Sequence, residues 1–201
     1  EFVRYPQNAV VNLGQSSFTL SCLAKSTQKN KLHYKWTLNG HDVRSQPDGH
    51  DQTGPSLVLH NVRHGDYGWY QCIVSDPVNT EEKVVSPKAY VIQPFLGSFQ
   101  NHPESGIVRV GESVVLSCLT GRSVPPARVY WEKDGIIFKS GTQKSETTKI
   151  IGQPLITETN MTLKITATDV VSGEYICVAE NNMTGDIYRS DPGSIQSAGE
   201  I

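Results

Sequence analysis

The sequence predicts an all-β chain that folds as two tandem β-sandwiches, with residues 1–94 as the first domain and residues 95–201 as the second. Short segments of alternating apolar and polar residues recur along the chain, as they do in half-buried strands. The composition includes 17 Gly and 11 Pro, which supply the turns between strands. A Cys–Trp–Cys pattern occurs twice, and 201 residues suit two domains.

The four cysteines are an even number at long intervals, and no Cys-x-x-Cys spacing occurs, so a metal site is not indicated. Two long-range disulfides, Cys22–Cys72 and Cys118–Cys177, are the economical interpretation. In the loop-entropy model each would stabilise its domain by roughly 4 kcal/mol. Such bonds persist in oxidising compartments, so we expect an extracellular location.

The first domain begins with an extended segment that Pro6 suits to an edge or to a switch between sheets, so we expect a first strand split into residues 2–6 and 9–11. Residues 18–22 form the next strand, in which every second side chain is apolar. This alternation aims Cys22 into the core.

A third strand at residues 34–38 carries Trp36 on its inward face and ends in Asn39-Gly40, a strong two-residue hairpin signal. We expect Trp36 to pack against the first disulfide. Residues 43–57 are polar and rich in turn residues, so they leave space for one short strand.

The stretch from Leu57 to Cys72 organises the first domain. Leu57 and Leu59 alternate into the core, and a turn follows with an Asp, a Gly and a Tyr placed six, four and two residues before Cys72. The Gly relieves the tight corner, and the Asp accepts hydrogen bonds within the turn. The last strand is expected at residues 83–92.

The second domain repeats this order a domain length later. Val171 stands where the corner Asp is expected, while Gly173 and Tyr175 are kept. We expect Phe95 and Leu96 to be partly buried at the domain junction and the first strand to lie at residues 99–103. The further strands are expected around residues 107–110, 114–118, 129–131, 137–138, 161–165 and 173–177.

The motifs of residues 57–72, 36–40 and 131–135 resemble intermediate-set immunoglobulin domains. That resemblance covers essentially the whole chain and implies two immunoglobulin-like β-sandwiches, in which the Tyr hydroxyl at the corner bonds back to the turn backbone. The segments 32–41 and 86–89 resemble the off-track and protein-tyrosine-kinase-seven group of receptor pseudokinases. This resemblance implies a single-pass co-receptor with an inactive kinase, active in Wnt-linked and axon-guidance signalling.

Two N-glycosylation motifs begin at Asn160 and Asn182. Alternation turns Asn160 away from the inward Met161 and hence toward solvent, while Asn182 falls in the turn before the last strand. We expect a glycan on at least one of these residues. A glycan at Asn182 would hinder partner binding at that end of the domain.

Trp69 is the one tryptophan that the core does not require, because Tyr70 and Cys72 take the inward positions. We therefore expect an outward face with Trp69, Ile73, His33 and Lys35 as a candidate protein interface. The alternative is that Lys35 merely covers Trp69 with its aliphatic stem.

The second domain offers an equivalent outward face, with Tyr130, Ile176 and Val178 expected together on it. It is the second candidate interface. Single exposed apolar residues are ordinary on protein surfaces, so the alternative is that this face binds no partner.

The charge of −2 excludes an electrostatic footprint for nucleic acid or an anionic membrane. No run is long enough to cross a bilayer, so attachment to a membrane would need a span outside this sequence. No catalytic motif is present, and we expect no enzyme activity, no cofactor and no metal. Five histidines lie in the first domain without ligand spacing and are expected to be solvated: His33, His41, His50, His60 and His64.

These observations predict an extracellular protein-recognition module of a cell-surface receptor, co-receptor or adhesion molecule. Its partner would be a protein ligand or co-receptor, or another copy of the chain. One alternative is a secreted binding or matrix protein made of the same domains. A second is an intracellular muscle-type pair of structural domains, in which the cysteines would be reduced and the glycosylation motifs silent.

Overall fold

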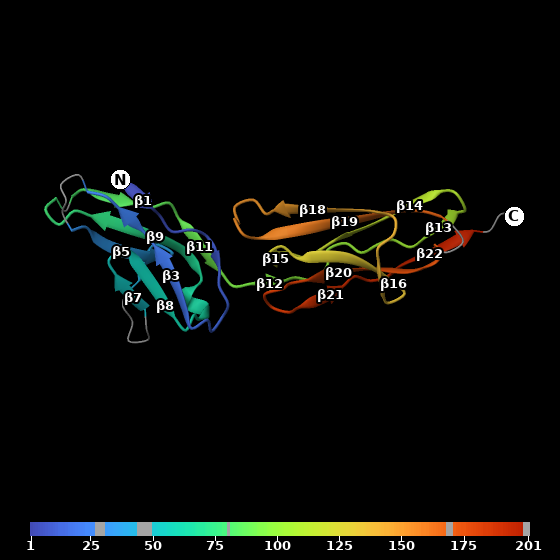
Figure 1. Cartoon of the computed structure of the whole chain (residues 1–201), viewed down its shortest axis with the longest axis horizontal. Coiled ribbons are helices and arrows are strands. Elements are labelled where there is room, and N and C mark those ends of the chain that lie inside the picture. Colours follow the sequence, from blue (N-terminus) through green and yellow to red (C-terminus); the bar gives the residue numbers. More distant parts are fainter. Residues whose placement is uncertain (27–30, 44–49, 80, 168–170, 199–201) are drawn as a thin grey trace. The chain divides into compact units, whose positions relative to one another are not determined.

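The computed structural model of the chain describes residues 1–26, 31–43, 50–79, 81–167 and 171–198 (Figure 1). Within these residues the chain consists of strands and turns, with one short 3-10 helix, η1 (His64–Asp66). It divides into two compact units, Glu1–Gln93 and Pro94–Ile201. Each unit is a β-sandwich, so the all-β fold predicted from the sequence is confirmed.

The first unit has two main sheets and one two-stranded sheet. One main sheet has the order β2-β11-β9-β5-β6, with β10 also paired to β9, and the other has the order β3-β8-β7. β1 pairs with β4. The strands are β1 (Phe2–Arg4), β2 (Ala9–Val10), β3 (Ser17–Ser21), β4 (Leu23–Ala24), β5 (His33–Leu38), β6 (His41–Asp42), β7 (His50–Thr53), β8 (Ser56–His60), β9 (Gly68–Ser75), β10 (Lys83–Val85) and β11 (Ala89–Ile92).

The first strand is split, as the sequence predicts. β1 runs antiparallel to β4, whereas β2 runs parallel to β11 in one of the main sheets. Pro6 is buried between the two pieces. Because proline cannot donate to a strand ladder, it suits the point where the chain leaves one sheet for the other.

The core of the first unit is built around the disulfide Cys22–Cys72. Trp36 lies opposite Cys72 in the β5–β9 register and is fully buried. Leu57 and Leu59 of β8 are also fully buried. Burying each of these large apolar side chains contributes about 1.5–3 kcal/mol, so the alternation read from the sequence accounts for most of this core.

The corner before β9 is closed by a tyrosine hydroxyl. Tyr70 donates a 2.6 Å hydrogen bond to the carbonyl of Asp66, and burial raises the pKa of Tyr70. In the second unit Tyr175 donates a 2.8 Å bond to the carbonyl of Val171. Since the acceptor is a backbone carbonyl in both units, the corner tolerates Val171 where the first unit has Asp66.

The second unit has two sheets. One has the order β12-β15-β19-β14, with β18 also paired to β19. The other has the order β13-β22-β20-β16-β17, with β21 also paired to β20. Its strands are β12 (Phe95–Leu96), β13 (Gly106–Arg109), β14 (Ser113–Leu119), β15 (Ser123–Val124), β16 (Arg128–Lys133), β17 (Ile136–Phe138), β18 (Thr142–Lys149), β19 (Thr157–Thr166), β20 (Gly173–Glu180), β21 (Ile187–Arg189) and β22 (Gly193–Ala198).

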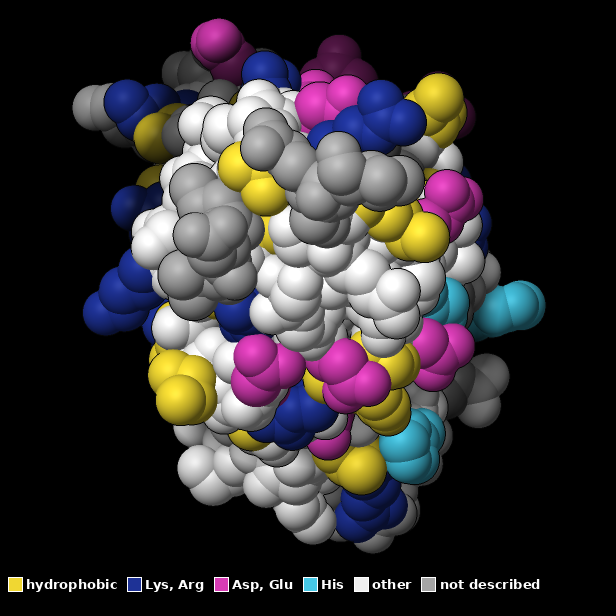
Figure 2. All heavy atoms as spheres, turned by 90° about the vertical axis from the view of Figure 1, so that its right-hand side faces the viewer, with side chains coloured by type: hydrophobic (Ala, Val, Ile, Leu, Met, Phe, Trp, Pro, Cys, Tyr) yellow, Lys and Arg dark blue, Asp and Glu magenta, His cyan; other side chains and the backbone are white. Residues whose placement is uncertain are grey.

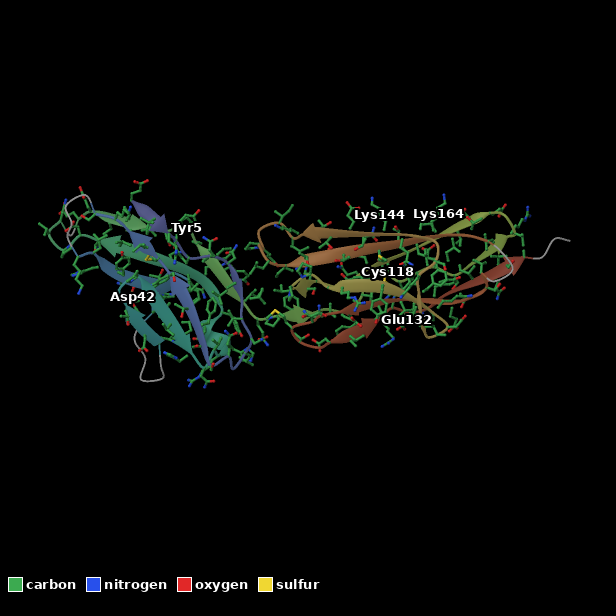
Figure 3. All side chains as sticks on the ribbon, in the orientation of Figure 1. Tyr5, Asp42, Cys118, Glu132, Lys144 and Lys164 are labelled. Carbon is green, nitrogen blue, oxygen red and sulfur yellow. A yellow bond between two sulfur atoms is a disulfide. The ribbon has the colours of Figure 1, made fainter. Side chains whose placement is uncertain are left out.

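The second core repeats the first. The disulfide Cys118–Cys177 joins β14 to β20, and Trp131 lies opposite Cys177 in register and is fully buried. Figure 3 shows Cys118 inside this sandwich. Leu163 of β19 is likewise fully buried. Both disulfides therefore have the pairing that the sequence predicts.

The beginning of the second unit differs from expectation. Phe95 and Leu96 form β12, which pairs with β15 inside this unit, and Leu96 belongs to its core. The strand expected at residues 99–103 is an isolated bridge between Asn101 and Leu119. The eight-residue strand β18 was also not expected, because its polar sequence lacks a core-facing apolar pattern.

The last strand of each unit is interrupted, whereas the sequence predicts a continuous strand at residues 83–92. β10 and β11 both pair with β9, but their registers differ by one residue. Ser86 lies at the break and is buried; its hydroxyl accepts a 2.9 Å bond from the N–H of Cys72 and donates one to the carbonyl of Pro87. The break therefore leaves no unpaired donor beside the disulfide.

Ser190 has the same role in the second unit. The registers of β21 and β22 on β20 also differ by one residue. The Ser190 hydroxyl accepts a 2.9 Å bond from the N–H of Cys177 and donates to the carbonyl of Asp191. A serine beside the cystine is thus a repeated part of this fold.

Replacing Ser86 with Ala is expected to lower the free energy of unfolding of the first unit by about 1–3 kcal/mol, because the N–H of Cys72 stays buried without an acceptor. Differential scanning calorimetry of the whole chain measures this as an earlier first-unit transition. Ser17→Ala, at an exposed serine of β3, is the matched control. Equal transitions for the two variants would refute the role given to Ser86.

Candidate protein interface

The outward face of the first unit lies on the sheet that contains β9. Alternate residues of β9 are buried, and Trp69, Gln71 and Ile73 take the intervening, half-buried positions. Trp69 and Ile73 therefore point away from the core, as the sequence predicts.

The structure places these side chains in two separate patches. Ile73 lies opposite Lys35 on β5 and opposite Val85 on β10. We call these three residues the Ile73 patch. Val85 is 53% exposed, and its contribution was missed because a continuous last strand would have turned it inward. The one-residue register shift at Ser86 is what brings it outward.

Trp69 belongs to the other patch. Its ring stacks on that of Tyr90 in β11, with centroids 4.7 Å apart and planes 27° apart. We call these two residues the Trp69 pair. Four residues separate Trp69 from Ile73, which is about 13 Å along a strand. The expected single cluster is therefore divided: Lys35 and His33, which lie opposite Ile73 and Ser75, are on the Ile73 side of the face and far from Trp69.

Lys35 is held by an ion pair and does not cover Trp69. Its ammonium lies 2.7 Å from Asp42 on β6, and both side chains are more than half exposed. An exposed pair of this kind contributes little to stability. The Ile73 patch thus combines apolar area with a charged border.

The outward face of the second unit carries cross-strand polar contacts. The Tyr130 hydroxyl donates a 2.7 Å hydrogen bond to Glu180, and Arg128 donates to the same carboxylate at 3.2 Å. Arg189 donates two 3.3 Å bonds to Glu132. Burial, followed by the bond to Glu180, raises the pKa of Tyr130, and the bonds to Glu132 raise the pKa of Arg189.

Val178, expected as an exposed member of this face, is fully buried. It lies in register between Tyr130 on β16 and Arg189 on β21, which cover it. Ile176 stays half-buried on the same face. The apolar area that remains outward comes from Ile137, at 49% exposure, and Ile187, at 52%.

Two histidines of the first unit lie beside carboxylates, and the other three are exposed. The ring of His50 lies 2.8 Å from Asp66, and that of His60 lies 3.1 Å from Asp51. Among the described residues, no group of three or more His, Cys, Asp or Glu side chains could hold a metal ion. His33, His41 and His64 are exposed.

Charges of one sign do not gather on the surface that Figure 2 shows, where acidic, basic and apolar side chains are intermingled. This distribution matches the formal charge of −2. In the part of the chain that the structure describes, no helix is long and apolar enough to cross a membrane.

The family profile described as the immunoglobulin domain matches residues 1–76 and 98–181, which together make up most of the chain. The chain belongs to the immunoglobulin superfamily. Both sandwiches are thus immunoglobulin domains.

This immunoglobulin chain is 32% identical to rat (Rattus norvegicus) contactin-3 over 122 residues, which cover 58% of the chain and 11% of contactin-3. It is 32% identical to chicken (Gallus gallus) protein sidekick-2 over 137 residues, which cover 66% of the chain and 6% of that protein. The solved structure of Rst D1-D2 matches with a TM-score of 0.55 and 16% identity, covering 98% of this chain and 99% of that one. The chain spans only about a tenth of the length of contactin-3 and less of that of sidekick-2.

The two glycosylation motifs of this immunoglobulin chain lie at exposed positions. Asn160 is exposed on β19, and its neighbour Met161 is buried, as alternation predicts. Asn182 is exposed in the turn between β20 and β21. That turn is anchored by the buried Asn181, whose amide donates 2.9 Å bonds to the carbonyls of Phe95 and Val124. No pattern in the sequence predicts this anchor.

Expression in a eukaryotic secretory system is expected to place N-glycans on Asn160 and Asn182. Glycosidase treatment followed by peptide mass spectrometry measures each site separately. Thr162→Ala, which removes the motif but keeps Asn160, should abolish the modification there and leave that at Asn182. An unmodified Asn160 peptide from the wild-type chain would contradict the expectation.

Proposed function

We propose that the chain is an extracellular protein-recognition module of an adhesion or receptor protein. The observation that carries the proposal is the apolar and aromatic side chains on the outward face of the first unit, the Trp69 pair and the Ile73 patch. Tryptophan and tyrosine dominate the energetics of protein interfaces because they bury large areas at small cost in side-chain entropy.

The similarity to contactin-3 and sidekick-2 supports the superfamily, and the two disulfides support an oxidising, extracellular compartment. The partner is a protein ligand, a co-receptor or another copy of the chain. The second unit offers the face around Tyr130 and Ile176 as the less apolar candidate, because cross-strand ion pairs and a tyrosine–carboxylate hydrogen bond cover its centre.

The more specific hypothesis is the ectodomain of a co-receptor of the off-track and protein-tyrosine-kinase-seven group, in Wnt-linked or axon-guidance signalling. It rests on residues 32–41 and 86–89. Two of these have fold-level roles that recur in the second unit. Asn39 accepts the N–H of Trp69 as Asp134 accepts that of Glu174, and Ser86 corresponds to Ser190. Because these two residues serve the fold, their match to the receptor group is evidence for an immunoglobulin fold more than for membership of that group.

The Trp69→Ala variant should weaken binding by about 2 kcal/mol or more if the Trp69 pair is the centre of the interface. Because the Tyr90 stack is also lost, we expect a stability loss of about 0.5–1.5 kcal/mol, which leaves the domain folded. Bead–bead aggregation measures self-binding, and flow cytometry of the tetramerised chain on intact cells measures other partners.

Two variants serve as controls for that experiment. Trp69→Phe keeps an aromatic ring against Tyr90 and should retain most of the stability, and Val78→Ala removes exposed apolar area from a turn away from the patches. If Trp69→Ala folds and binds as the wild type does, the interface lies elsewhere, and the face around Tyr130 and Ile176 is the next to test.

The oxidation state of the cysteines distinguishes the extracellular proposal from the muscle-type alternative. Thiol titration in denaturant of protein that has not been reduced should find no free thiol. The same titration after reduction should find the four cysteines of the sequence. Four free thiols before reduction would favour the intracellular alternative. The secreted alternative is decided by whether a membrane span follows in the full gene.

A further inference from the structure

β18 of the second unit is a long, regular edge strand. It pairs with β19 along all eight of its residues without a register shift. Its other edge has no partner strand among the described residues, and Figure 1 shows it at the border of its sheet. Every residue of β18 except Gln143 is exposed.

Proteins usually protect such an edge. They shorten the strand, bend it with a bulge, or place a proline or charged residues in it, because unpaired N–H and C=O groups invite another strand. β7, the outer strand of the corresponding sheet in the first unit, has four residues. β18 has twice that length, contains no proline and includes Thr142, Thr147 and Thr148, which favour extended backbone.

The charges on β18 are arranged so that one self-pairing register is favoured. Lys144 and Glu146 lie on the same outward side of the strand, 3.9 Å apart, with Ser145 between them. In an antiparallel pair of two β18 strands centred on Ser145, each Lys144 lies opposite Glu146 of the other copy. Directly opposite residues of antiparallel strands are close neighbours, so two opposite-charge pairs form.

Neighbouring registers lack this complementarity. Centring the pair on Lys144 or on Glu146 places like charges opposite each other, and a parallel in-register pair places both residues opposite their own kind. Like charges directly opposite are destabilising. The register centred on Ser145 also extends the contact over residues 142–148, nearly the full strand.

We propose that β18 binds β18 of a second copy of this chain, antiparallel about a two-fold axis at Ser145, and so continues the β14-β19-β18 sheet across both copies. Backbone hydrogen bonds supply the attraction, and the Lys144–Glu146 pairs fix the register. One strand pair buries little area, so the association is weak and depends on concentration. It uses a different surface from the Trp69 pair and goes beyond the function proposed above.

Sedimentation equilibrium of the whole chain tests this contact. The wild type should dimerise reversibly. Lys144→Glu makes both positions acidic and Glu146→Lys makes both basic, so each variant alone should dimerise about tenfold more weakly or worse. An equimolar mixture of the two variants should recover wild-type association, because opposite charges again face each other in the mixed dimer.

Lys164→Glu is the matched control. Lys164 lies opposite Thr142 on β19, which is not the edge strand. Figure 3 shows it on the same side of the sheet as Lys144. The Lys164→Glu substitution changes the net charge by the same amount as Lys144→Glu and should leave the dimerisation constant within about twofold of the wild type. Trp69→Ala should also leave it unchanged, which separates this contact from the proposed function.

Three results would overturn the proposal: a wild-type chain that stays monomeric at the highest attainable concentration, single variants that dimerise as the wild type does, or a mixture that fails to recover. The last result would show that the charges act other than across a Lys144–Glu146 pair.

Discussion

The cystine at the centre of each sandwich determines where the neighbouring side chains point. Cys72 faces inward opposite Trp36, so Tyr70 and Val74 share its buried side and Trp69 and Ile73 are turned outward. Cys177 and Trp131 repeat the arrangement. The backbone N–H groups of Cys72 and Cys177 would be unpaired where the last strand breaks, and a serine hydroxyl accepts each of them. Core, corner and outer faces all depend on this arrangement.

The fold could be read from the sequence wherever a strand has a buried side. The strands around Cys22, Trp36, Leu57 and Cys118 were predicted because alternating apolar residues reveal them. β18 could not be, since an exposed edge strand buries almost nothing and carries no such pattern. The breaks at Ser86 and Ser190 were missed for another reason: a one-residue register shift is a backbone event that the alternation of side chains does not encode.

The sequence predicts which side chains of the candidate site point outward, but not which residues lie beside them. The sequence shows that Trp69 and Ile73 point outward, because side chains alternate between the two faces of a strand and Cys72 faces inward. Which side chains lie beside them depends on the registers of other strands, so Tyr90 and Val85 were missed, and His33 and Lys35 were grouped with Trp69 although they lie near Ile73. The burial of Val178 likewise depends on Arg189 from a strand whose register is set by the break.

The parallel pairing of first and last strands has a consequence for a protein that is pulled by its ends. β2 runs parallel to β11, and β13 runs parallel to β22, so tension applied at the two ends of a domain loads these ladders in shear. All their hydrogen bonds then resist together instead of opening one after another. The β13–β22 ladder spans four residue pairs and the β2–β11 ladder spans two, so fewer residue pairs share the load in the first domain. Once a ladder parts, the disulfide keeps the residues between its cysteines from extending, which limits how far each domain lengthens.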